Sequence, residues 1–372
     1  MSFDFVPHLE AAAAIAATHA ADVDRGTFPT ATLAAMRTSG LLGLVSATEV
    51  GGKGLGLAAA AAVVERLARE CGSTAMVVCM HYCGTAVLEA HGPRAVREAI
   101  AKGEHLTTLA FSELGSRSQF WAPVSTATAE GADVRLTARK SWVTSARHAD
   151  SYVWSSKPVA GSEASTLWLV PRATAGLRIA ETAFDGIGLR GNDSSPVTAE
   201  DTKIPASARL GDDGAGFGIM MGAVLPWFNV LSAAFSTGLM EAAVTRTAAH
   251  VGGTRFEHAS STIADLPTVR AFIARMRIAT DQNKALLADT LAAMGVNRAD
   301  TMLRVLESKA SAGESAAMVT DLAMRVCGGA AFRKDVAVER IFRDSRASLV
   351  MGPTVDVLYD FIGKAVCGLP LF

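Results

Sequence analysis

The sequence predicts an α+β protein of several domains: an N-terminal helical domain, a middle antiparallel β domain and a C-terminal four-helix bundle. Its 372 residues are too many for one typical hydrophobic core. The composition also changes twice along the chain. Helix formers dominate first, then short runs rich in threonine, serine, valine and tryptophan, then long amphipathic stretches. We therefore expect domains at residues 1–105, 106–212 and 213–372.

Each element follows from a local pattern. Residues 57–70 offer good helix formers, and glycine pairs and Pro93 break the helices of the first domain. Strands separated by turn residues are expected at 124–129, 134–138, 152–155 and 166–170. Beyond Gly214 the amphipathic pattern predicts four helices, at about 218–251, 262–292, 299–327 and 335–366.

Composition excludes several classes of function. The formal net charge is −1 without long blocks of one sign, so nothing indicates binding to nucleic acid or to an anionic membrane. No stretch approaches the roughly 20 apolar residues that span a bilayer, and the alanine-rich run at 11–17 lacks the basic leader of a signal peptide. The five cysteines fit neither a zinc site nor a disulfide framework, which predicts buried reduced thiols in a cytoplasmic protein without a metal site.

The glycine-rich run at 49–56 does not carry the spacing of a dinucleotide-binding fingerprint. A turn between helices is the better interpretation, because glycine adopts backbone conformations that other residues avoid.

A series of motifs follows in order along the chain. They are Phe111-Ser112-Glu113, Lys140-Ser141-Trp142-Val143-Thr144, Thr254-Arg255-Phe256, Arg325 with Gly328-Gly329, and Glu339 with Arg343-Asp344. Each alone is weak, but the ordered set resembles the acyl-CoA dehydrogenase flavoproteins. The resemblance implies that family's fold, FAD as cofactor and an acyl-CoA or related thioester as substrate. It also implies a homodimer or homotetramer, because the two glycines meet FAD across a subunit contact in that family.

The resemblance also implies which residues contact FAD. Ser112, beside Phe111, would contact the flavin pyrimidine ring, and Ser118 the pyrophosphate. Trp142 would lie against the dimethylbenzene end and Thr144 near N5. The remaining cofactor-binding residues would be Arg255, Phe256, Arg325, Gly328, Gly329 and Thr354. Leu114, Arg117 and Gln119 depart from the family pattern. Without the resemblance, Trp142 would be interpreted as an ordinary core tryptophan.

The two positions at which the family places its catalytic carboxylate hold Met351 and Phe228. A thioether or a phenyl ring cannot accept a proton, so neither is a general base. Asp356 and Glu241 are the displaced candidates. Asp356 would point more than a quarter-turn away from Met351 if both lay on one helix.

Three functions stay open at this stage. The chain is an FAD-dependent oxidoreductase acting on an acyl thioester with a displaced base, a flavin-dependent monooxygenase of the same fold, or the base-lacking subunit of a heteromeric dehydrogenase. In the second case His81, His148 or Asn229 could assist at the flavin, although a lone histidine is more often a structural residue.

Overall fold

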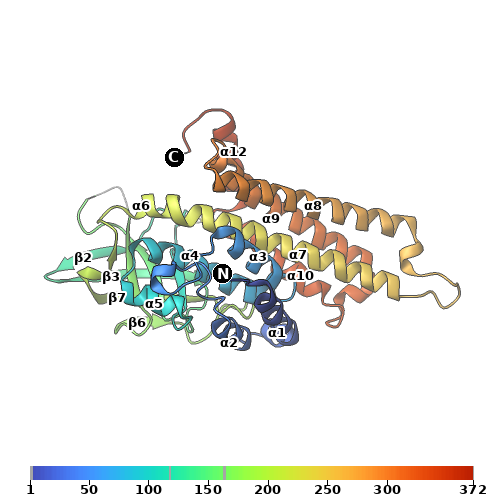
Figure 1. Ribbon diagram of the computed structural model, residues 1–372, viewed down its shortest axis with the longest axis horizontal. Helices are drawn as coiled ribbons and strands as arrows, with labels where there is room; N and C mark the ends of the chain where they lie inside the picture. Colours follow the sequence, from blue (N-terminus) through green and yellow to red (C-terminus); the bar gives the residue numbers. More distant parts are fainter. Residues whose placement is uncertain (1–2, 117–118, 162–164, 372) are drawn as a thin grey trace. The chain divides into compact units, whose positions relative to one another are not determined.

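The computed structural model describes residues 3–116, 119–161 and 165–371 (Figure 1). It confirms the predicted order of helices, β structure and helices. Two compact units can be distinguished. The first comprises Met1–Ala60, Met76–Gly186 and Arg190–Phe228, and the second comprises Ala61–Ala75, Ile187–Leu189 and Asn229–Phe372.

The N-terminal part of the chain is helical, as the alanine and leucine content predicts. Its helices are α1 (Val6–Asp24), α2 (Thr30–Thr38), α3 (Leu57–Ala68), α4 (Gly72–His91) and α5 (Arg94–Ala101). The glycine-rich run forms the predicted turn before α3. At Gly52 a Cβ atom would lie 2.0 Å from the Ser46 carbonyl oxygen, so only glycine fits there.

In the described residues the β structure forms two four-stranded sheets. Their strand orders are β1-β4-β5-β8 and β2-β3-β7-β6, and the β1–β4 pair is parallel. The strands are β1 (Thr107–Ala110), β2 (Thr126–Glu130), β3 (Asp133–Val143), β4 (Ser151–Ser156), β5 (Thr166–Pro171), β6 (Leu177–Ile179), β7 (Ser195–Pro205) and β8 (Arg209–Leu210). Inward-facing residues of both sheets, including Leu136, Trp154 and Trp168, form one buried cluster.

The C-terminal part contains long helices that lie side by side (Figure 1). They are α7 (Leu225–Gly253), α8 (Pro267–Gly295) and α9 (Thr301–Cys327). A short helix α6 (Gly216–Ile219) and a π-helical turn (Met220–Val224) precede α7. The predicted single helix at 335–366 is wrong. It is divided into α10 (Val338–Ser345), α11 (Ala347–Val350) and α12 (Val355–Val366). The break between α11 and α12 follows from Pro353, which lacks an N–H group and disfavours helical backbone at the residue before it.

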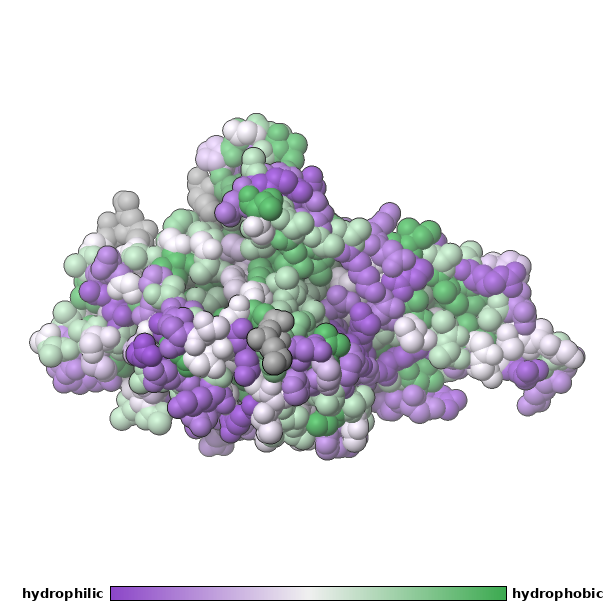
Figure 2. All heavy atoms as spheres, viewed as in Figure 1, coloured by the Kyte–Doolittle hydropathy of each residue, from purple (hydrophilic) through white to green (hydrophobic). Residues whose placement is uncertain are grey.

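Among the described residues, only the run Gly216–Gly253 is apolar and long enough to cross a membrane, and 67% of its most apolar stretch is buried in the protein, as in a core helix. Four cysteines are buried as predicted, whereas Cys367 is exposed. Hydrophobic side chains reach the surface on and after α12, at the top of Figure 2, where Tyr359, Val366 and Leu369 are exposed.

Candidate functional site

Trp142 lies on an irregular part of β3. The pairing of β3 with β7 changes register between Lys140 and Val143, and Trp142 has a φ of 55°, which is unusual for a residue with a side chain. Its indole is not in the core, because the residue is 59% exposed. The Phe184 ring contacts the indole, with 4.1 Å between ring centroids and an interplanar angle of 32°. The core-tryptophan interpretation is therefore wrong, and the strand presents a flat aromatic surface.

Thr144 follows Trp142 in a tightly held turn. Thr144 itself is buried, and Ser145 donates its N–H to the Asn192 carbonyl oxygen at 2.9 Å. The Asp193 carboxylate accepts the backbone N–H of Arg147 at 2.7 Å and its guanidinium Nε at 2.8 Å. These contacts fix the backbone around Thr144 without using its hydroxyl group.

The Phe111–Ser112 segment lies beside this strand. Phe111 is buried against Phe120, with ring centroids 6.2 Å apart, whereas Ser112 is exposed. The Ser112 carbonyl oxygen accepts the N–H of Ser141 at 2.8 Å. The structure thus brings together the two predicted flavin-binding segments of the first unit. Ser118, the predicted pyrophosphate contact, lies outside the described residues.

In the second unit, Arg255 and Phe256 lie in the connection after α7, and Arg255 pairs with Thr262 in an isolated β-bridge. Arg255 is exposed, and Phe256 is half-buried beside His258. The exposed Arg255 guanidinium on this turn suits contact with an anion.

The end of α9 carries the predicted adenosine-binding residues. The Arg325 guanidinium lies 5.0 Å from the centre of the Phe272 ring, which holds the side chain in place at the surface. Gly328 has φ 56° and ψ −137°, a conformation essentially restricted to glycine, and a Cβ added at Gly328 or Gly329 would meet no atom within 4 Å. This surface is open to close approach of a ligand.

Thr354 has a structural role of its own. It is the N-cap of α12, and its hydroxyl oxygen accepts the N–H of Val357 at 3.4 Å. Any contact that this threonine makes with a cofactor would be additional to the cap.

Met351 is half-buried at the end of α11. Its carbonyl oxygen accepts a hydrogen bond from the Lys309 ammonium at 2.9 Å, and the Pro353 carbonyl oxygen accepts another. Lys309 is only 1% exposed, so a buried cation holds the segment that contains the predicted base position. Because this segment is not helical, the expected helical angle between Met351 and Asp356 does not apply.

The two displaced candidates for the base differ in their surroundings. Glu241 accepts hydrogen bonds from Arg277 at 2.9 Å and from Lys284. Burial alone would raise its pKa, but these two cations outweigh burial and lower the pKa to about 2. Asp356 lies exposed in the first turn of α12. Phe228, at the other predicted base position, is buried.

His81 is a structural residue. It is fully buried, its Nε2 bonds to the Leu42 carbonyl oxygen at 3.0 Å, and its Nδ1 accepts the N–H of Thr107 at 3.3 Å. Burial lowers its pKa to about 4, so the ring is neutral at physiological pH. His148 stacks on Phe28, with 3.8 Å between ring centroids.

Asn229 is different from both histidines. It is 0% exposed, and among the described residues neither its amide nitrogen nor its amide oxygen has a hydrogen-bond partner. Such a group costs free energy unless a water molecule or a ligand satisfies it.

These residues fit FAD. The exposed indole of Trp142 offers a face for a planar ring, the Gly328–Gly329 backbone leaves room for a ligand, and Arg325 offers a cation beside it. Phe184 and Lys309 were not found from the sequence. Phe184 lies in a loop without a recognisable pattern. Lys309 does not lie within an apolar run, so no pattern in the sequence indicated that it is buried.

Comparison with known proteins agrees with this description. Models of the acyl-CoA dehydrogenase N-terminal, middle and C-terminal domains match residues 10–103, 108–202 and 214–367. The chain is 28% identical over 348 residues to human mitochondrial short-chain specific acyl-CoA dehydrogenase, covering 91% of this chain and 83% of the relative. It is 27% identical over 338 residues to an L-prolyl-[peptidyl-carrier protein] dehydrogenase of Pseudomonas fluorescens, covering 88% and 87%.

The fold is also that of a solved structure, butyryl-CoA dehydrogenase from Megasphaera elsdenii. The two superimpose with a TM-score of 0.88 at 19% identity, over 99% of this chain and 100% of that one. The three matched domains together account for nearly the whole chain. The chain therefore belongs to the acyl-CoA dehydrogenase family of FAD-dependent oxidoreductases that act on CH–CH groups.

Proposed function

We propose that this chain oxidises an acyl thioester with FAD and uses a base other than the carboxylate that the family places at Met351 or Phe228. The observation that carries the proposal is the exposed indole of Trp142 beside the buried Thr144, on a strand whose backbone is distorted at that point. When bound, FAD supplies the two-electron oxidation. Trp142 would bind the dimethylbenzene end of the cofactor and Ser112 the pyrimidine end.

The second unit carries the other predicted FAD contacts, and the resemblance implies that its two glycines meet FAD across a subunit contact. Arg325, Gly328 and Gly329 are proposed to bind the adenosine part, and Arg255 with Phe256 the pyrophosphate. The open backbone at the two glycines and the exposure of both arginines support this assignment. Ser118 and Thr354 stay predictions of the family resemblance.

Of the two displaced candidates, we propose Asp356 as the base. Glu241 is occupied by two cations, and a carboxylate with a pKa of about 2 has little affinity for a substrate proton near neutral pH. Asp356 is exposed, and it follows the Met351–Thr354 segment directly. The Asp356→Asn substitution tests this choice.

Two other functions are also compatible with apolar side chains at both predicted base positions. A flavin-dependent monooxygenase needs no base to remove an acyl proton. A base-lacking subunit of a heteromeric dehydrogenase would obtain its base from a partner. The relatives act on coenzyme A or carrier-protein substrates by their names, so both classes of thioester belong in the assay.

One experiment separates the three functions. The chain is purified alone, its visible spectrum is recorded, and acyl-CoA and acyl-carrier-protein thioesters are added without oxygen. A yellow protein that is bleached by a thioester, and much more slowly in the D356N variant, is the expected result. Bound flavin that ignores thioesters and consumes oxygen only with a flavin reductase indicates the monooxygenase. A colourless chain rescued by co-expression with a neighbouring gene indicates the heteromeric subunit.

We further propose a homodimer or homotetramer in the cytoplasm, with domains at 1–105, 106–212 and 213–372. The exposed Phe332, directly after the Gly328–Gly329 element, supports a subunit contact there because a large apolar side chain is 80% exposed.

A further inference from the structure

A buried ion pair lies next to both flavin-binding segments of the first unit. The Lys140 ammonium and the Glu113 carboxylate are 2.5 Å apart, and their side chains are 0% and 2% exposed. Lys140 also donates to the carbonyl oxygen of Ser155 at 2.7 Å and to its hydroxyl oxygen at 3.0 Å. Its side chain occupies an inward-facing position of β3, after the buried residues Leu136 and Ala138.

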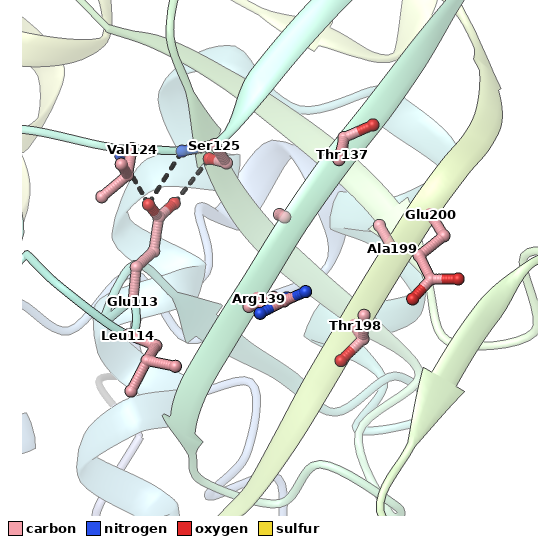
Figure 3. A pocket seen from close by; sticks show the side chains of 10 residues that line it. Glu113, Leu114, Val124, Ser125, Thr137, Arg139, Thr198, Ala199 and Glu200 are labelled. Carbon is pink, nitrogen blue, oxygen red and sulfur yellow. Dashed lines mark hydrogen bonds between the residues drawn. The ribbon is translucent and has the colours of Figure 1, made fainter.

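The Glu113 carboxylate uses both of its oxygens. Oε2 accepts the backbone N–H groups of Val124 at 2.5 Å and Ser125 at 2.9 Å, and Oε1 accepts the Ser125 hydroxyl at 2.5 Å. Figure 3 shows the carboxylate pointing toward these two residues, beside a groove of about 400 Å³ that Leu114 and Arg139 help to line. The pair therefore joins four segments of the chain, at Glu113, Ser125, Lys140 and Ser155.

Each member of the pair stabilises the charged form of the other. Burial lowers the pKa of Lys140 to about 8, against the attraction of Glu113. Burial would raise the pKa of Glu113, but Lys140 and the hydrogen-bond donors hold it below its ordinary value. Both groups are charged at neutral pH, and removing either one would leave the other buried without its counter-ion.

The pair also lies between two predicted cofactor contacts. Glu113 directly follows Ser112, and Lys140 precedes Trp142 by two residues. Glu113 and Lys140 form an isolated antiparallel bridge, with hydrogen bonds from Ser141 N–H to Ser112 O at 2.8 Å and from Leu114 N–H to Arg139 O at 3.2 Å. The loop and the strand are thus joined on both sides of the ion pair.

We propose that Glu113 and Lys140 are positioning residues for FAD, which hold Ser112 and Trp142 at the spacing that the flavin needs. The proposal uses from the proposed function only that FAD binds beside Trp142. It concerns cofactor affinity and is independent of the identity of the base or the substrate. Neither residue is expected to touch the cofactor.

The test compares FAD affinity with stability in matched variants. The single variants are Glu113→Gln and Lys140→Met. The double variant Glu113→Gln with Lys140→Met removes both charges together, while the glutamine amide oxygen can still accept the N–H groups of Val124 and Ser125. Lys140→Arg is the conservative variant. Glu130→Gln with Arg135→Met is the control, because it removes an exposed ion pair of 2.7 Å from the same sheet. Apoprotein is titrated with FAD by fluorescence quenching, and thermal unfolding is followed without FAD.

We expect the double variant to unfold near the wild-type temperature, because neither buried charge is left without its counter-ion and the glutamine keeps an acceptor for the two backbone N–H groups. It should nevertheless bind FAD at least about tenfold more weakly. The control should bind FAD as the wild type does, and Lys140→Arg should recover part of the affinity.

Several results would overturn the proposal. A double variant with wild-type FAD affinity would show that the pair serves the fold alone. Unfolded protein in both the double variant and Glu113→Gln would lead to the same conclusion. Failure of the proposed function would give a different result from failure of this proposal. It would be seen in the wild-type chain, as bound flavin that no thioester bleaches.

Discussion

Replacing Trp142 by alanine should weaken cofactor binding and leave the fold almost intact. The indole is 59% exposed, so its removal takes little apolar surface out of the core. Its contact with Phe184 has a centroid distance of 4.1 Å, and such a pair contributes about 0.5–1.5 kcal/mol. At this exposed position we expect the lower part of that range, so W142A should lower the free energy of unfolding by about 1 kcal/mol or less.

The effect on FAD should be larger. Stacking of a flat heterocycle on an aromatic side chain contributes about 1–3 kcal/mol. The dissociation constant for FAD should therefore rise about 5- to 150-fold in W142A, and W142F should recover part of the affinity.

Two measurements on the same preparations check this. FAD titration of apoprotein gives the dissociation constant, and urea unfolding without FAD gives the stability. W168A is the matched control, because Trp168 is fully buried and its loss should cost about 3–5 kcal/mol of stability. Wild-type FAD affinity in W142A, together with a loss of several kcal/mol, would refute the assignment of the indole to the cofactor.

Three further predictions concern the second unit. In the D356N variant, which lacks the proposed base, M351E places a carboxylate at the predicted base position and should raise the rate of flavin bleaching by a thioester about 10²- to 10⁴-fold, measured by anaerobic stopped-flow. An equal gain from M351Q in the same variant would contradict a role as base. Glu241, with a pKa of about 2 against 4.5 unfolded, stabilises the fold above pH 4.5, and this stabilisation is lost as the pH falls from 4.5 toward 2. Wild type and E241Q should therefore differ by about 1–2 kcal/mol at pH 6, after allowance for partial exposure, and should converge toward pH 2 in urea unfolding. N229L should raise the stability by about 1–3 kcal/mol in thermal unfolding, because it removes a buried amide that has no partner among the described residues. N283L is the control and should lower the stability, because it loses the 2.9 Å hydrogen bond to the Ala279 carbonyl oxygen. A destabilised N229L would indicate that water or a ligand satisfies the Asn229 amide.

The sequence predicted the elements whose pattern is local. The alternation through Val134, Leu136 and Ala138 indicated a strand, and β3 contains it, although the strand continues to Val143. The extension was missed because Lys140 breaks the apolar alternation. A lysine can face inward only if a counter-ion is buried with it, and that counter-ion, Glu113, comes from a separate segment 27 residues away.

The same limit applies to the candidate site. The motifs indicated Trp142 and Gly328, but the exposure of the indole and its contact with Phe184 depend on how distant segments meet. The break at residues 351–354 was visible as Pro353, yet the amphipathic pattern continued on both sides and favoured one helix. Lys309 could not be linked to Met351 from the sequence because the two are 42 residues apart and interact through a backbone carbonyl group.

The positions that violate local rules indicate which part of the family's chemistry this chain retains. Trp142 is exposed and has a left-handed backbone, which costs about 1–3 kcal/mol. Such a cost persists where function requires the conformation, and it occurs on the strand assigned to the flavin. Met351 violates no such rule, because a half-buried methionine at a helix end carries no strain and leaves no polar atom unpaired. The structure therefore has a costly backbone conformation at the residue proposed to bind the flavin, whereas the residue at the predicted base position packs without strain. This contrast favours a flavoprotein that retains the flavin-binding strand. Its general base would then lie at another position, or its reaction would need none.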